Sequence, residues 1–104
     1  MTDTQKACLD ACLECFRACE VCTDCCIGAA ERSDCLRLCL DCADVCALCV
    51  RLLGRNSRFA AQSCAMCAEI CEACAAECEK HKPQACQDCA QACRRCAEAC
   101  RQMG

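Results

Sequence analysis

Cysteine recurs at fixed intervals through almost the whole of this sequence. Twenty-two of the 104 residues are cysteine, and the stretches CLECFRACEVC from Cys12 and CLDCADVCALC from Cys39 repeat intervals of three and four residues. A thiolate is a soft metal ligand and also a redox-active group. The spacing therefore indicates metal binding or thiol redox chemistry.

The candidate ligands form four groups separated by short gaps. Within each group the intervals alternate between three and four residues, which places the thiols on one face of an α-helix. Twenty-one cysteines follow this alternation and Cys25 does not. We predict that every cysteine and the single histidine are metal ligands: Cys8, Cys12, Cys15, Cys19, Cys22, Cys25, Cys26, Cys35, Cys39, Cys42, Cys46, Cys49, Cys64, Cys67, Cys71, Cys74, Cys78, His81, Cys86, Cys89, Cys93, Cys96 and Cys100.

Helices are the elements that must position these groups. The intervening residues are mostly good helix formers, and charged side chains occupy the face opposite the cysteines. Residues with capping or helix-ending preferences fall in the gaps: Thr2 with Gln5 as a capping box, Ser33 and Asn56 or Ser57 as N-caps, Gly54 at a C-terminus and Pro83 in a first turn. The sequence predicts helices near 3–29, 34–53, 57–80 and 84–102.

Short connections make consecutive helices antiparallel neighbours. We therefore expect an all-α fold, an antiparallel up-down-up-down four-helix bundle with a cysteine-lined core, formed by residues 1–104 as a single domain. The second helix has a wider apolar face, which suits either packing on neighbouring helices or a subunit interface. That face comprises Leu36, Leu38, Val45, Val50 and Leu52.

Composition excludes several classes of function. Twelve basic and 15 acidic residues give a net charge of −3 with no run of one sign, so we expect no nucleic-acid or membrane partner. The N-terminal MTDTQKACLD lacks the apolar segment of a secretory signal, which favours a cytoplasmic protein. One histidine, no identifiable pair of buried carboxylates and no phosphate-binding glycine loop predict no catalytic residues and no enzyme.

Several roles for the thiols remain to be weighed. Cysteine can act as a small apolar residue, but leucine would bury more area without the risk of oxidation. A disulfide scaffold is disfavoured because small scaffolds of that kind are rich in loops. A ferredoxin-type iron–sulfur cluster is disfavoured because it needs a loop of cysteines wrapped around the cluster, which a straight helix cannot supply. A redox protein would need a few accessible thiols of low pKa beside basic groups, whereas we expect most thiols here to be buried and alike.

Among metals, zinc needs four ligands, which layers of facing helices could supply in places. Copper(I) fits best because it is soft and accepts two or three sulfurs, and cysteines at i and i+4 lie on one helix face. Nine C-x-x-x-C pairs can be drawn without reuse: 8/12, 15/19, 22/26, 35/39, 42/46, 67/71, 74/78, 89/93 and 96/100. We expect the other four cysteines, at 25, 49, 64 and 86, to complete sites across helices.

Charge balance supports a store for many ions. Roughly 22 monovalent ions, or about 11 divalent ones, would neutralise 22 thiolates. Protonated thiols are weakly apolar, so the bundle should fold before it is loaded. The sequence therefore predicts high-capacity copper(I) storage, with multiple copper(I) ions per chain. A thiol redox protein or a general soft-metal (Zn, Cd, Ag) sequestration protein is the alternative.

The two ends of the predicted bundle differ. His81 shares one end with Cys25, Cys26, Cys35 and Cys86, and we expect metal to pass through this mouth. The other end collects an apolar plug of Met1, Leu53, Phe59 and Met103. The thioethers Met66 and Met103 are soft enough for copper(I), but we expect both to serve in packing.

The repeated C-x-x-x-C and C-x-x-C spacing over all four predicted helices resembles that of the bacterial copper storage proteins. These are four-helix bundles whose cores hold many copper(I) ions on cysteine thiolates. The absence of a leader resembles the cytosolic branch of the family. The resemblance implies a homo-oligomer, with a tetramer favoured, and passage of copper at a histidine-bearing end, where His81 is the one residue available.

Overall fold

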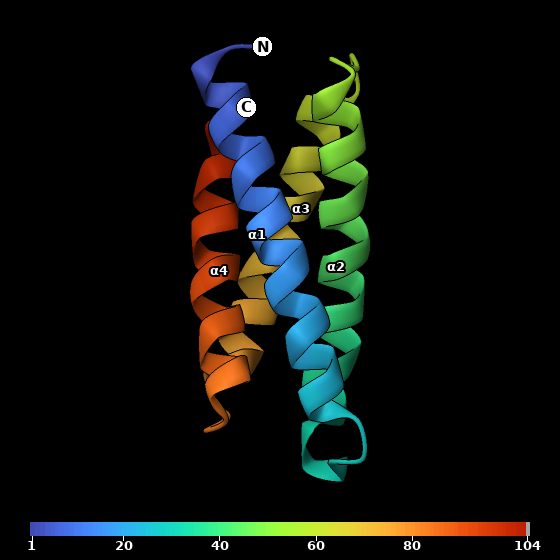
Figure 1. Cartoon of the computed structure of the whole chain (residues 1–104), viewed down its shortest axis with the longest axis vertical. Coiled ribbons are helices and arrows are strands. Elements are labelled where there is room, and N and C mark those ends of the chain that lie inside the picture. The colour runs from blue at the N-terminus through green and yellow to red at the C-terminus, as the bar shows by residue number, and fades with distance from the viewer. Residues whose placement is uncertain (104) are drawn as a thin grey trace.

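Four α-helices account for most of this computed structural model, which describes residues 1–103 (Figure 1). No strand occurs within those residues. A short 3₁₀ turn, η1 (Ala30–Arg32), precedes the second helix. The helices are α1 (Asp3–Cys26), α2 (Ser33–Gly54), α3 (Ala60–Cys78) and α4 (Gln84–Arg101).

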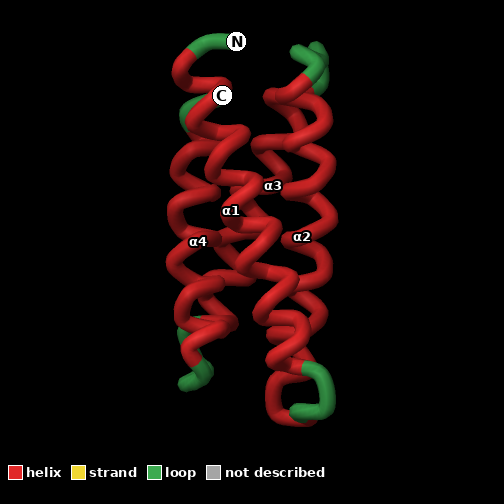
Figure 2. Tube along the Cα trace, in the orientation of Figure 1, coloured by secondary structure: helices red, strands yellow, loops and turns green. Residues whose placement is uncertain are grey.

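The helices run antiparallel to their neighbours in an elongated bundle. Each consecutive pair of helices is in contact, and α1 also packs on α4, which closes the bundle. The molecule measures 40 × 17 × 17 Å. The loops lie at the two ends, and both chain termini share one end with the α2–α3 turn (Figure 2). The predicted antiparallel four-helix bundle with a cysteine-lined core is confirmed.

The first helix begins with the predicted capping box. The Gln5 backbone N–H donates to Thr2 Oγ1 at 3.1 Å, and the Thr2 backbone N–H donates to Gln5 Oε1 at 2.8 Å. These two bonds satisfy backbone donors that the first turn of a helix leaves unpaired. The helix ends at Cys26, before the predicted residue 29, and Gly28 adopts a left-handed φ of 83° in the turn that follows.

The other predicted N-caps are wrong. Ser33 is the first residue of α2 because η1 leads directly into the helix, and no side chain caps its start. Asn56 has a left-handed φ of 52° and belongs to the turn after α2. Ser57 Oγ accepts a hydrogen bond from the Phe59 backbone at 3.1 Å, so it stabilises a turn and α3 begins only at Ala60. Pro83 occupies the N-cap position of α4, immediately before the predicted first turn.

The core is a continuous column of thiols. Small side chains fill the space beside it, and Ala43, Ala75, Ala90 and Ala97 are each no more than 2 % exposed. Of the wide apolar face of α2, Val45 is buried, and Leu36, Leu38, Val50 and Leu52 pack partly buried against the column. None of the helices within residues 1–103 is long and apolar enough to cross a membrane.

Candidate metal centre

The candidate metal centre is this column of cysteines. Twenty-one of the 22 thiols are at most 1 % exposed, and they come from all four helices. Cys25, which the spacing set apart, is the partly exposed one. The alternation of three and four residues therefore identified which cysteines face inward. All 22 are free thiols.

Sulfur atoms meet chiefly across helices. Cys15 of α1 illustrates this, because its Sγ lies 3.7 Å from that of Cys42, 3.9 Å from Cys71 and 3.6 Å from Cys93, one thiol on each of the other helices. The shortest separations join α2 to α3: Cys35 to Cys78 and Cys42 to Cys71, both 3.5 Å. A metal ion inside the column could therefore draw ligands from more than one helix.

Contacts within one helix also occur at five of the nine predicted C-x-x-x-C pairs. Their Sγ–Sγ separations are 4.0 Å for 15/19, 3.7 Å for 67/71, 3.9 Å for 74/78, 3.9 Å for 89/93 and 4.0 Å for 96/100. Cys8, by contrast, meets Cys64 and Cys100 at 3.7 Å each. Cross-helix neighbours are thus at least as close as the pairs within one helix.

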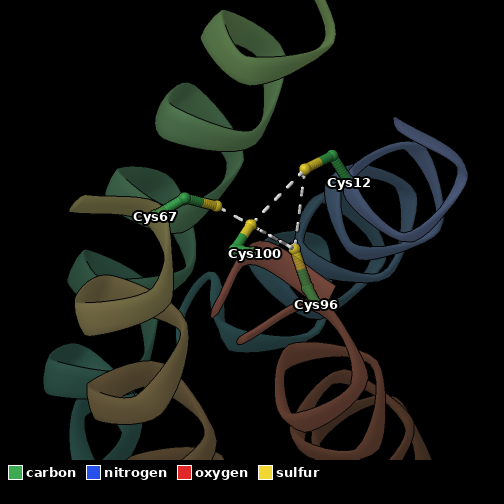
Figure 3. A group of neighbouring side chains, drawn as sticks. All are labelled: Cys12, Cys67, Cys96 and Cys100. Atoms are coloured by element: carbon green, nitrogen blue, oxygen red, sulfur yellow. Dashed lines mark hydrogen bonds between the residues drawn. The ribbon is translucent and has the colours of Figure 1, made fainter. Parts of the chain in front are cut away.

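Groups of four thiols lie close enough to share one ion. Figure 3 shows Cys12, Cys67, Cys96 and Cys100, which converge from α1, α3 and α4 with their sulfurs within 4.8 Å of one another. Other such groups follow along the column: Cys15, Cys19, Cys42 and Cys93; Cys15, Cys46, Cys71 and Cys96; Cys19, Cys74, Cys89 and Cys93; Cys22, Cys35, Cys39 and Cys78. The groups share members, so neighbouring ions could be bridged by common thiolates.

The four cysteines outside the C-x-x-x-C pairs lie at the ends of the helices. Cys64 and Cys86 reach across to α1, where they meet Cys8 and Cys22, each at 3.7 Å. The Cys49 thiol donates instead to Ser63 Oγ at 3.4 Å. The backbone carbonyl of Cys25 accepts a hydrogen bond from Arg32 at 2.9 Å.

Ser63 is a core residue that the sequence analysis missed. It is 6 % exposed, and its hydroxyl donates to the Ala60 carbonyl at 3.0 Å while it accepts from Cys49. The signal that could have found it is its place directly before Cys64, beside the cysteine face of α3. The Ser63 hydroxyl therefore links the Cys49 thiol to the backbone of the first turn of α3.

Burial favours the neutral form of the thiols in the metal-free state. It raises the pKa of Cys35, where Cys78 adds to the effect, and it raises the pKa of Cys86. A buried thiolate without a cation beside it is disfavoured in this way. Metal binding must therefore release protons from the column.

His81 follows the end of α3, where its side chain has a partner of its own. Its Nε2–H donates to Glu77 Oε2 at 2.8 Å, and the two side chains are 15 % and 16 % exposed. The hydrogen bond from His81 lowers the pKa of Glu77. Gln87 donates to the His81 carbonyl at 2.6 Å, which fixes the α3–α4 connection. The imidazole is thus held in place near water.

The predicted apolar plug is only half correct. Leu53 is 2 % exposed and Met103 packs partly buried against the column. Met1 and Phe59, however, are 69 % and 51 % exposed, because Met1 precedes the capping box and Phe59 lies in the turn before α3. Met66 is also exposed, at 46 %, away from the thiols.

A family model described as "Csp: Copper storage protein" matches residues 1–104. The chain belongs to the copper storage protein family. Among solved structures, the apo copper storage protein 3 from Bacillus subtilis is 48 % identical, with 94 % of this chain and 96 % of that chain covered and a TM-score of 0.90. No curated protein matches the chain.

Two further solved structures of the family contain copper. The Cu(I)-bound copper storage protein BsCsp3 is 45 % identical, with 97 % of this chain and 98 % of that chain covered and a TM-score of 0.92. A cytosolic copper storage protein from Streptomyces lividans with five coppers is 34 % identical, with 97 % and 92 % covered and a TM-score of 0.92. The match to the copper storage family thus covers all four helices that line the column.

Proposed function

We propose that this chain is a high-capacity store that holds many copper(I) ions on cysteine thiolates inside a preformed bundle. The observation that carries the proposal is the column of 21 buried free thiols, most of which lie within 4.0 Å of another thiol. Copper(I) accepts two or three sulfurs, and the column offers such sets along its whole length. Membership of the copper storage family and the Cu(I)-bound relative support the same ion.

We assign the ligand set to all 22 cysteines, with His81 at the mouth. Each thiolate that loses its proton adds one negative charge, and each copper(I) ion returns one positive charge. Roughly one ion per thiolate would therefore leave a nearly neutral interior. Residues 1–104 would act as one unit, because the thiols of all four helices contribute to a single column.

An anaerobic titration tests this function. Fully reduced, metal-free protein is titrated with copper(I) against a competing chelator while helicity is followed by circular dichroism. Tight binding of more than about ten ions without a change in helicity is expected for a preformed multi-thiolate store. Binding of one to three ions, or binding that needs folding, would contradict the proposal.

A pair of variants of α2 separates the interior from the surface. Cys42→Ala with Cys46→Ala removes two buried thiols, so the capacity should fall by one or two ions while the helices remain. The matched control is Asp41→Ala with Asp44→Ala, which changes two exposed residues of the same helix. The control should keep the full capacity. An unchanged capacity in the cysteine variant would count against storage in the column.

We further propose that the chain works in the cytosol as a homo-oligomer, with a tetramer favoured. Large apolar side chains remain exposed on α1 and α2, among them Leu13 at 46 %, Leu40 at 44 % and Phe16 at 37 %. A subunit interface would bury them. Light scattering of the purified protein measures the assembly, and Phe16→Glu should reduce its mass. Fractionation of cells that express the full-length protein tests the location.

A further inference from the structure

The middle of the column holds a group of four thiols that approach one another closely. Cys15 and Cys19 of α1 approach Cys42 of α2 and Cys93 of α4. Five of the six Sγ–Sγ separations are 3.6–4.0 Å: 15–19 at 4.0 Å, 15–42 at 3.7 Å, 15–93 at 3.6 Å, 19–93 at 4.0 Å and 42–93 at 3.8 Å. The sixth, 19–42, is within 4.8 Å.

These separations describe a tetrahedron. If the four sulfurs lay in one plane with these five separations, the sixth would be about 6.9 Å, whereas a tetrahedral site needs it close to the other five. The Cys19–Cys42 separation lies within 4.8 Å, so the four sulfurs surround a common centre. A zinc ion bound at 2.3 Å by four thiolates would place their sulfurs about 3.8 Å apart. The metal-free group already has nearly that size.

We propose that this group, which we call the central quartet (Cys15, Cys19, Cys42 and Cys93), binds one tetrahedral, thiophilic divalent cation, zinc above all, when the column is free of copper. Packed thiols reach separations near 3.7 Å by van der Waals contact alone. In the quartet, separations of 3.6–4.0 Å hold for five of the six pairs at once, across three helices, and the sixth pair stays within 4.8 Å. Copper(I), which is satisfied by two or three sulfurs, does not need the fourth.

Two neighbouring thiols could stabilise the negative charge of such a site. Binding releases four protons to solvent and leaves a site of net charge −2. Two neighbouring thiols can donate to it: Cys71 lies 3.5 Å from Cys42 and 3.9 Å from Cys15. Cys89 lies 3.7 Å from Cys19 and 3.9 Å from Cys93. Each of these thiols can direct its hydrogen to a ligand sulfur, which stabilises a buried anion.

The site would also join three helices. The quartet draws on α1, α2 and α4, so one ion would cross-link elements that are otherwise held by small side chains. A ligand that binds the folded chain alone stabilises it by an amount that grows with the logarithm of the ligand concentration above Kd. The inference goes beyond copper storage, because it depends on the thiol geometry and not on the presence of copper.

The test begins with Zn²⁺ and fully reduced, copper-free protein under anaerobic conditions, with a competing zinc chelator. One ion per chain should bind more tightly than every later ion. Co²⁺ added to one equivalent should give the visible d–d absorption of a tetrahedral tetrathiolate. A first equivalent that spreads over several equal sites, or a Co²⁺ spectrum without four sulfur ligands, would overturn the proposal.

Two variants of α4 locate the ion. Cys93→Ala removes one ligand, and since loss of a group beyond the ligands costs 10- to 100-fold in affinity, we expect the first Zn²⁺ to bind at least about 100-fold more weakly. Cys86→Ala is the matched control, because Cys86 is a buried thiol of the same helix outside the quartet. It should change the affinity by less than about threefold. Equal weakening in both variants would sink the assignment.

Two further measurements keep the test decisive. Helicity is recorded for both variants, and Cys93→Ser, which keeps a heavy atom at the γ position, replaces Cys93→Ala if the latter loses helix. The copper(I) titration of the unmodified chain is separate. High copper capacity without a preferred zinc ion would reject this site alone, whereas one tight zinc ion with low copper capacity would reject the storage function alone.

Discussion

The two ends of the bundle are built from the same helices but from different side chains. At the end with η1 and the α3–α4 connection, Cys25 is partly exposed, Arg32 hydrogen bonds to its carbonyl, and His81 is held by Glu77. At the opposite end Leu53 is 2 % exposed and Met103 packs on the thiols. One end places polar groups beside sulfur, and the other covers the sulfur with apolar side chains.

We infer from this difference that the ends of the bundle, and not its middle, determine the direction in which metal ions enter and leave the column. Between the ends, the same interval of cysteines recurs on every helix, so nothing in the middle distinguishes one direction of travel from the other. We propose that a few polar residues where the helices stop make the His81 end the place where ions exchange with water. The same fold with these residues interchanged would be expected to load from the other end.

The largest effect is expected from Leu53→Ala at the apolar end. Truncating a fully buried leucine costs about 2–5 kcal/mol, because transfer energy is lost and a cavity is left. Urea denaturation of the metal-free, reduced protein measures the change. His81→Ala at the polar end should cost less than about 1 kcal/mol, because its hydrogen bond to Glu77 is partly exposed to solvent. Similar losses in both variants would remove the distinction between a structural end and an exchanging end.

A smaller effect is expected on the rate of copper uptake. His81→Ala should slow the uptake of copper(I) severalfold in stopped-flow experiments, because a neutral imidazole near water can accept an ion before the thiols do. The final capacity should change by no more than one ion. Lys82→Ala, at an exposed neighbouring position, is the control and should load at the normal rate. Slower uptake in Leu53→Ala but not in His81→Ala would reverse the assignment of the ends.

The smallest effect concerns acid pH at the His81 end. The pKa of Glu77 is held below its ordinary value of 4.5, chiefly by the hydrogen bond from His81. The folded state therefore binds this proton less readily than the unfolded state. The stabilisation is present in full above pH 4.5 and is lost as the pH falls through the lower folded value.

Glu77→Gln removes this carboxylate and tests the relation. The stability difference between the unmodified chain and the variant should be constant above pH 4.5 and should shrink below it. Denaturation of the metal-free protein at a series of pH values measures the difference. A difference that grows as the pH falls would show that the carboxylate does not gain from the imidazole.

The sequence predicted the column better than it predicted the helix ends. The interval of three and four residues gave the inward face of every helix and also excluded Cys25, because helical periodicity is a property of the chain itself. The start of α3 was placed too early because Ser57, a good capping residue, forms a turn with Phe59 instead. Competing local hydrogen bonds of this kind are not resolved by residue preference alone.

The contacts between sulfurs could not be predicted to the same degree. The C-x-x-x-C rule concerns one helix, whereas the 3.5 Å approach of Cys42 to Cys71 depends on the axial register between α2 and α3. That register is set by the packing of side chains such as Val45 and Ala75, not by spacing along the chain. The tetrahedral arrangement of the central quartet could not be predicted from the spacing for the same reason, because it also depends on the register between helices.

The elongated shape of 40 × 17 × 17 Å has a consequence for how such a protein can grow. Inserting seven residues into each helix would add two cysteines per helix, eight in all, and about 10 Å of length. The cross-section, and every packing relation within it, would stay the same. Volume would rise in proportion to the thiols, so the density of sulfur is independent of size. Selection could therefore change the number of ions held per chain by changing the length of the helices, without a new type of site.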